Sequence, residues 1–342
     1  MCKSVFVLLP CVLAAERVTL ENPSARMAWE MDGGALVEFK LKELDLNPLV
    51  WEDRSSSAAR PRSHFLCLDR WGAPSEAEAA AGVPFHGEAA RVSWKLLGSN
   101  ATDAEMTAQL PLARLAVKRT VRLQGGVALV REAVTNLAPL GRIYNMVQHP
   151  TIGPPFLDQA TVVDANARQG FMQSSPLPNP ENPMVVWPQA LKDGVPVNLR
   201  ELKDDPNPNV VSFVIDDETG WAAAVNAAKG LMIGYAWKTA DYPWFNAWRH
   251  VEGGQPVARG LEFGTTGLHQ PYAVLVKKGR IFGRPLYSYL DATDTAVRSY
   301  QVFLLRVPRS YRGVARITRK GGELVVGGRD GSELRVRDLL GE

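Results

Sequence analysis

The sequence predicts an all-β protein built as one large antiparallel β-sandwich, and three observations support this. Glycine and proline, 29 and 24 of the 342 residues, interrupt the chain at short intervals. The stretches between them are short and rich in β-branched and aromatic residues, as is typical of strands. Only one segment has the composition of a helix. Because no linker or exact repeat divides the chain, residues 16–342 are expected to form a single domain.

Alternating apolar and polar residues predict the individual strands, because successive side chains of a strand point to opposite faces. A hairpin is expected where the strands 115–123 and 127–134 flank the turn Gln124-Gly125-Gly126. The other expected strands are 35–41, 210–215, 221–226, 231–237, 272–277, 299–307, 313–318, 323–326 and 333–336.

Two segments depart from this pattern. Ser75 is a plausible capping residue for a short helix over the alanine-rich and glutamate-rich residues 76–81. Residues 169–205 contain many prolines and asparagines, and they are expected to form a long irregular loop. Loops of this kind on a β scaffold often carry binding groups.

Composition excludes several classes of function. The 39 basic and 36 acidic residues leave a net charge of +3, too small and too evenly spread to predict nucleic-acid binding. Motifs for nucleotide, serine hydrolase and zinc chemistry are absent, so no cofactor is expected. Asp216, Asp217 and Glu218 either bind calcium or form a solvated turn, and this alternative stays open.

The amino terminus has the pattern of a signal peptide. Lys3 precedes the apolar residues 4–13, and alanines at 14 and 15 offer a cleavage site, which predicts export. The apolar run is too short to span a bilayer, and a first buried strand is the alternative. Of the three cysteines only Cys67 would remain after cleavage, and its apolar neighbours predict a packed side chain.

Two of the five histidines and one carboxylate are the candidates for chemistry. His86 lies before a predicted strand, His149 follows a long strand pair, and Glu262 lies near the start of a late strand. Imidazole titrates near neutral pH and a carboxylate can act as a base, so together they suit proton transfer on a neutral polar substrate. The alternatives are structural histidines and a solvated carboxylate.

Aromatic residues gather between positions 235 and 248. Their rings can pack on the C–H faces of a sugar while neighbouring polar groups bind its hydroxyls, or they can fill the core of the sandwich. The residues are Tyr235, Trp237, Tyr242, Trp244, Phe245 and Trp248.

Three separated elements resemble the galactose mutarotase-like (aldose 1-epimerase) superfamily over residues 26–310. They are His86-Gly87 with Arg91 and Trp94 downstream, a strand pair ending at Asn136 and followed by His149-Pro150, and Glu262. The resemblance implies the large β-supersandwich of that superfamily and a small-molecule or polymeric carbohydrate as the ligand.

The resemblance also implies a role for each candidate residue. Glu262 would remove the proton from the anomeric hydroxyl and His149 would protonate the ring oxygen, so that the ring opens and recloses as the other anomer. His86 would hydrogen-bond the sugar. Arg70 is the rough counterpart of the family's arginine, Asp205 and Asp241 are alternatives for its aspartate, and Trp244 and Trp248 are the aromatic residues expected near the sugar.

One local departure keeps other functions open. Glu262 is followed by Phe-Gly-Thr-Thr, whereas proline is common after the base in true epimerases. A carbohydrate-binding protein without catalysis, or a lyase or hydrolase of the same fold, therefore stands beside the epimerase. No nucleic acid and no stable membrane insertion are expected, and the oligomeric state is left open.

Overall fold

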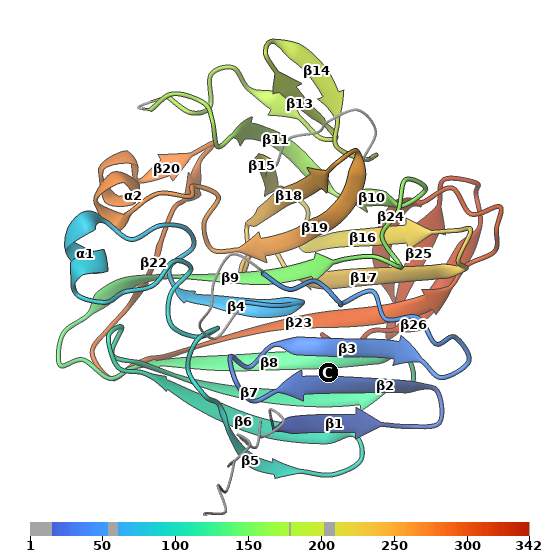
Figure 1. Cartoon of the computed structure of the whole chain (residues 1–342), viewed down its shortest axis with the longest axis horizontal. Helices are drawn as coiled ribbons and strands as arrows, with labels where there is room; N and C mark the ends of the chain where they lie inside the picture. Colours follow the sequence, from blue (N-terminus) through green and yellow to red (C-terminus); the bar gives the residue numbers. More distant parts are fainter. Residues whose placement is uncertain (1–15, 54–60, 178, 202–208, 342) are drawn as a thin grey trace, which may run out of the picture.

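The computed structural model describes residues 16–53, 61–177, 179–201 and 209–341. Two large antiparallel sheets face each other, which confirms the predicted all-β sandwich (Figure 1). The predicted signal peptide and Asp205 lie outside the described residues, so export stays a prediction. No described helix is long and apolar enough to cross a membrane.

The first sheet has eleven strands and carries the candidate residues. Its path begins at the amino-terminal strands and ends beside the hairpin of β13 (Gln189–Lys192) and β14 (Val195–Asn198), and β22 (Ser288–Leu290) pairs with β9 off this path. In spatial order the strands are β1 (Arg17–Glu21), β2 (Ala25–Glu30), β3 (Leu36–Leu41), β4 (His64–Asp69), β9 (Arg142–Ile152), β19 (Gln255–Gly264), β18 (Trp244–Glu252), β15 (Asn209–Ile215), β11 (Ala167–Met172) and β12 (Val185–Val186).

The second sheet has eight strands. The predicted hairpin at 124–126 joins two of them, and it forms where the sequence places it. In spatial order they are β10 (Val162–Ala165), β16 (Thr219–Asn226), β17 (Leu231–Lys238), β23 (Thr295–Arg306), β8 (Val127–Asn136), β7 (Leu115–Gln124), β6 (Asp103–Leu110) and β5 (Lys95–Ser99).

The main core fills the space between the two sheets. Side chains from the inner faces of both sheets, such as Met146, Phe263, Val117 and Val302, are fully buried there. Because side chains alternate along a strand, the neighbours of Met146 and Phe263 point to the outer face of the first sheet. The outer face of the first sheet is therefore the face on which side chains are not needed to fill the main core.

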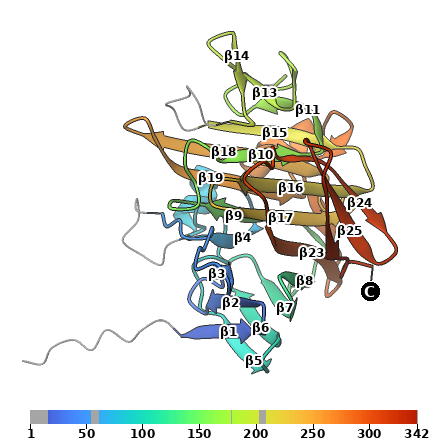
Figure 2. The same ribbon diagram turned by 90° about the vertical axis from the view of Figure 1, so that its right-hand side faces the viewer.

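A third, smaller sheet covers part of the outer face of the second (Figure 2). It contains β24 (Val314–Lys320), β25 (Glu323–Gly328) and β26 (Glu333–Arg337), as the sequence predicts. Ile317 and Val326 pack with Trp221 and Phe303 of the eight-stranded sheet, so the carboxyl-terminal strands have their own apolar contact with the sandwich.

Two predictions of local structure are wrong. Residues 272–277, expected as a strand, form the helix α2 (Tyr272–Lys278), which begins after Pro271 and ends at Gly279. Residues 169–205, expected to be irregular, contain most of β11 together with β12 and the β13–β14 hairpin. A short pair, β20 (Arg280–Ile281) and β21 (Arg284–Pro285), follows α2. The predicted helix at 76–81 is confirmed as α1 (Glu76–Ala80), capped by Ser75.

Candidate functional site

Strand register brings Glu262 and His149 together on the outer face of the first sheet. The pairing of β19 with β9 matches Gly260 with Thr151 and Phe263 with Gln148, which sets Glu262 opposite His149. Nε2 of His149 lies 3.2 Å from Oε1 of Glu262. His149 therefore lies within β9 rather than after a strand, and Glu262 lies near the end of β19 rather than its start.

The Glu262 carboxylate is buried, with 1% of its surface exposed, and is not the solvated group that simple alternation allows. The indole Nε1 of Trp71 donates a hydrogen bond of 2.8 Å to Oε2. Burial raises the pKa of Glu262 well above its ordinary value, and the Trp71 hydrogen bond opposes that shift. The proton of this carboxyl group is therefore held more tightly than in water.

His149 is a neutral imidazole held on two sides. Its Nδ1 lies 2.9 Å from the hydroxyl of Thr151, and its ring stacks on Phe65 with the centroids 4.2 Å apart. Burial lowers the pKa of His149 to about 3. Burial disfavours both imidazolium and carboxylate, so it favours the form of the pair in which Glu262 carries the proton and His149 is neutral.

His86 lies in the loop between α1 and β5, in a left-handed backbone conformation with φ of 66°. The next residue must be glycine, because a Cβ on Gly87 would lie 2.3 Å from the carbonyl oxygen of Leu68. The amide of Gly72 donates to Nδ1 of His86 over 3.0 Å, so the neutral ring carries its hydrogen on Nε2. Burial, and then the neighbouring His149, lowers the pKa of His86 well below its ordinary value.

His269 and Trp71 complete the site, although neither is among the site residues that the sequence predicts. The ring centroid of His86 lies 5.4 Å from that of His149 and 5.4 Å from that of His269. His269 in turn lies 4.7 Å from Trp71, edge to face. With the Trp71–Glu262 and Glu262–His149 contacts, these residues form a closed circuit of five side chains, which we call the five-residue site.

Aromatic side chains surround the five-residue site. Trp248 of β18 lies 5.8 Å from His149 and 5.3 Å from Trp51, measured between ring centroids. Phe85 packs against His86 at 4.1 Å, although 45% of its surface is exposed. An exposed aromatic ring beside buried imidazoles is suited to packing against a partly apolar ligand.

A cavity of about 550 Å³ reaches the site at Trp248 and His269. Its walls come from the end of β11 and the β13–β14 hairpin, which lie within the segment 169–205 predicted to carry binding groups, and from β15 and β18, which lie outside that segment. This volume lies in the ordinary range for small-ligand sites. Polar residues line it as well, including Gln173, Asp193 and Asn209.

The structure does not bring Trp244, Arg70 or Asp241 into contact with the five-residue site. Trp244 is fully buried in a separate cluster, where its indole donates to the carbonyl of Pro285 over 2.9 Å. Arg70 forms ion pairs with Glu78 at 2.7 Å and Asp69 at 3.3 Å. Asp241 lies in the turn before β18, where its carbonyl accepts from Arg298.

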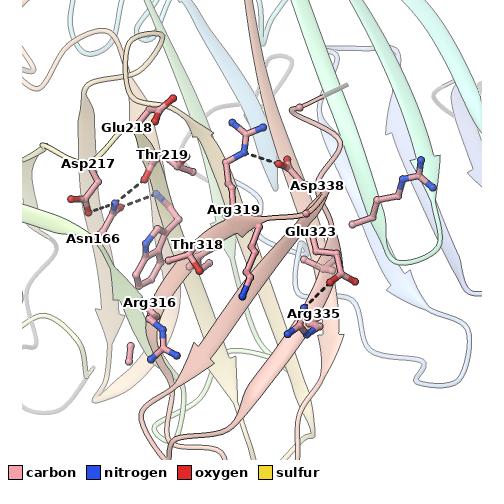
Figure 3. A pocket seen from close by; sticks show the side chains of 18 of the residues that line it. Asn166, Asp217, Glu218, Thr219, Arg316, Thr318, Arg319, Glu323, Arg335 and Asp338 are labelled. Carbon is pink, nitrogen blue, oxygen red and sulfur yellow. Dashed lines mark hydrogen bonds and ion pairs between the residues drawn. The ribbon is translucent and has the colours of Figure 1, made fainter.

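A larger cavity, of about 1380 Å³, lies elsewhere, between the β15–β16 turn and the carboxyl-terminal sheet (Figure 3). Its charged side chains pair with one another, for example Arg319 with Asp338 at 2.6 Å and Arg335 with Glu323 at 2.9 Å. Asp217 and Glu218 of the calcium alternative line it, but none of the residues predicted to bind or act on a carbohydrate does. The smaller cavity is the better candidate for ligand binding, because His269 of the five-residue site lines it.

The calcium alternative finds no geometric support within the described part of the chain. Asp216 pairs with Arg284, and Asp217 accepts a hydrogen bond from Asn166. No group of three or more His, Cys, Asp or Glu residues in the described ranges is arranged to hold a metal ion.

Comparisons with known proteins identify the fold. The sequence matches no family profile and no curated protein. The structure matches a galactose mutarotase-like protein from Clostridium acetobutylicum, with a TM-score of 0.63, 13% identity, and coverage of 86% of this chain and 96% of that one. A galactose mutarotase-like protein from Lactobacillus casei gives 0.61, 14% identity, and coverage of 85% and 100%. A protein from Escherichia coli K12, provisionally assigned as an aldose 1-epimerase, matches with a TM-score of 0.64 and 15% identity. The match covers 86% of this chain and 100% of that one.

Proposed function

Starting from the galactose mutarotase-like fold of the chain, we propose that it binds a carbohydrate and interconverts its anomers. In this reaction Glu262 and His149 transfer the protons that open and close the sugar ring. The contact between their polar atoms, 3.2 Å apart, is the observation that carries the proposal.

The distance suits the reaction. The anomeric hydroxyl and the ring oxygen are bonded to the same carbon, so the group that accepts a proton and the group that donates one must lie side by side. Two groups far apart on the sheet could not reach both oxygens. The fixed register of β9 and β19 supports this pairing without relying on a flexible loop.

The pKa shifts favour the reverse of the roles that the resemblance implies for ring opening. Ring opening needs one protonated and one unprotonated group, and burial favours the form in which Glu262 holds the proton and the His149 imidazole is neutral. In that form the sugar replaces the direct contact between the two groups: Nε2 of His149 accepts from the anomeric hydroxyl while Glu262 donates to the ring oxygen. Because the reaction is reversible, reclosure uses the opposite assignment, with Glu262 as base and His149 as donor.

The surrounding residues support sugar binding. The Nε2–H of His86 is available to donate to a sugar oxygen, because its Nδ1 already accepts from Gly72. Trp248 and Phe85 offer ring faces and edges to the C–H groups of a pyranose. His86 and Trp248 contact His149 of the pair that would act on the anomeric carbon, and Phe85 contacts His86.

The test is anomer interconversion, followed by polarimetry and NMR on a panel of pure aldose anomers. We expect an accelerated rate for at least one sugar, and a loss of about 10²–10⁴-fold in Glu262→Gln, which keeps the side-chain shape but transfers no proton. A panel on which the wild type gives only the spontaneous rate would overturn the proposal. So would a Glu262→Gln variant that is as active as the wild type.

A carbohydrate-binding protein without catalysis is the second candidate. The observation that favours it is that Arg70, the rough counterpart of the family's arginine, and Asp241, one of the two alternatives for its aspartate, have their polar contacts outside the five-residue site. Saturation-transfer NMR separates the two candidates. Sugar binding retained by both wild type and Glu262→Gln, with no rate enhancement in either, would favour the binding protein.

A further inference from the structure

We propose that His269 is a specificity-determining residue that hydrogen-bonds one hydroxyl of the sugar away from the anomeric carbon. This inference rests on the proposed function and extends it to the recognition of the substrate. It assigns to the ligand a neutral hydroxyl group near the junction of the five-residue site and the 550 Å³ cavity.

Of the residues in the five-residue site, His269 is the one that also lines the 550 Å³ cavity. It contacts His86 and Trp71 within the site, and it also lines the cavity together with Trp248. Among the described residues, neither ring nitrogen of His269 has a hydrogen-bond partner, whereas one ring nitrogen of His86 and both of His149 have polar partners. A half-buried imidazole with free polar atoms beside a cavity is suited to receive a polar ligand group.

The backbone around His269 holds this ring in place. Gly72 has a φ of 100°, and a Cβ there would lie 2.9 Å from the imidazole, so the ring packs where only glycine leaves room. The amide of His269 donates to Oε1 of Gln173 over 3.0 Å, and Nε2 of Gln173 donates to the carbonyl of Gly267 over 2.6 Å. The ring is thus positioned before any ligand arrives, which lowers the entropic cost of binding.

The position of His269 separates it from the proton transfer itself. Trp71 lies between His269 and Glu262, contacting the first at 4.7 Å between centroids and the second through a hydrogen bond of 2.8 Å. If the anomeric carbon of the sugar lies at the Glu262–His149 pair, the hydroxyl that hydrogen-bonds His269 is therefore not the anomeric one. Burial lowers the pKa of His269 to about 4, so the neutral ring can both donate and accept.

The experiment compares His269→Leu and His269→Gln with the wild type, using an aldose that the wild type accepts and the set of its monodeoxy analogues. We expect His269→Leu to raise KM about tenfold or more while kcat changes less, and His269→Gln to restore part of the loss. For the one analogue that lacks the recognised hydroxyl, wild type and His269→Leu should have equal KM. His250→Gln is the matched control, since His250 pairs with Glu252 at 3.1 Å on the same sheet and should leave KM unchanged.

The outcomes separate this inference from the proposed function. If the wild type neither binds nor interconverts any aldose, the proposed function fails. If the wild type acts on an aldose and both His269 variants keep its KM across all analogues, only the inference on His269 fails. If the wild type binds without catalysis, the same comparison is made with Kd, and equal Kd values overturn the inference. Thermal melting identifies a His269→Leu variant that does not fold, in which case His269→Gln and the analogue series decide.

Discussion

The indole N–H of Trp71 donates to the carboxylate of Glu262 over 2.8 Å, although the two residues are 191 positions apart in the sequence. This contact stabilises the ionised carboxylate, while burial stabilises the protonated form. The balance between the two determines the pH range in which the Glu262–His149 pair carries a single proton. Trp71 is thus a positioning residue, and its effect on the pKa of Glu262 can be measured in the pH–rate profile.

We predict that Trp71→Phe moves the alkaline limb of the pH–rate profile to higher pH. The variant keeps an aromatic ring but removes the hydrogen bond that lowers the pKa of Glu262, so deprotonation of the carboxyl group needs a higher pH. The measurement is the rate of anomer interconversion against pH, after subtraction of the spontaneous rate. A limb that stays in place or moves to lower pH would contradict this role.

The buried histidines predict a loss of stability in acid. Burial lowers the pKa of His149 to about 3 and that of His269 to about 4, whereas an unfolded histidine takes up its proton near pH 6.5. Their contribution is therefore fully present above pH 6.5 and is lost as the pH falls toward 4. At pH 4.5 the lowered pKa of each of these two histidines should reduce the unfolding free energy by about 2–3 kcal/mol relative to neutral pH.

Urea unfolding between pH 7.5 and 4.5 measures this effect. The raised pKa of Glu262 acts in the opposite direction, because it favours the folded state as the pH falls, so the series is best run on Glu262→Gln. Adding His269→Leu to that background should flatten the pH dependence relative to Glu262→Gln alone. Identical slopes for Glu262→Gln and the double variant would refute the assignment.

Local patterns were sufficient for the strands but not for the surroundings of the site. The alternation in β7 and β8 and the turn at Gly125 predict a hairpin correctly, because both signals lie within neighbouring residues. The valines of α2 resemble a strand, and the correct signals were Pro271 before the helix and Gly279 after it. Proline and glycine at these two positions outweigh the β-branched run between them.

The site residues show the same limit more clearly. The sequence predicts His86, His149 and Glu262 as site residues because each lies in a recognisable local motif, and the structure brings the three side chains together. Trp71 and His269 have no such motif, and their contacts depend on how the loops after β4 and β19 fold over the sheet. Spacing in the sequence cannot report contacts of that kind.

Gly87 offers a test of how the His86 loop is built. A side chain at Gly87 meets the carbonyl of Leu68 at 2.3 Å, whereas Gly125, also at positive φ, has open space around it. We predict that Gly125→Ala costs about 1–2 kcal/mol of unfolding free energy from backbone strain alone and leaves sugar binding intact. Gly87→Ala should cost more than Gly125→Ala and should weaken sugar binding, because the loop must shift and His86 with it. Equal losses in urea unfolding, with binding kept in both, would rule this out.

Trp244 and Trp248, both expected near the sugar from the sequence, should respond in opposite ways to replacement by leucine. Trp244 is fully buried against Phe171 and should act through stability, so Trp244→Leu is expected to cost about 3 kcal/mol or more while the remaining folded protein keeps its sugar affinity. Trp248 is half-buried, lines the cavity and contacts His149, so Trp248→Leu should change stability by about 1 kcal/mol or less and weaken sugar binding about tenfold. Urea unfolding and NMR titration of each variant measure the two effects separately. The assignment fails if Trp248→Leu binds sugar as the wild type does, or if Trp244→Leu loses affinity without losing stability.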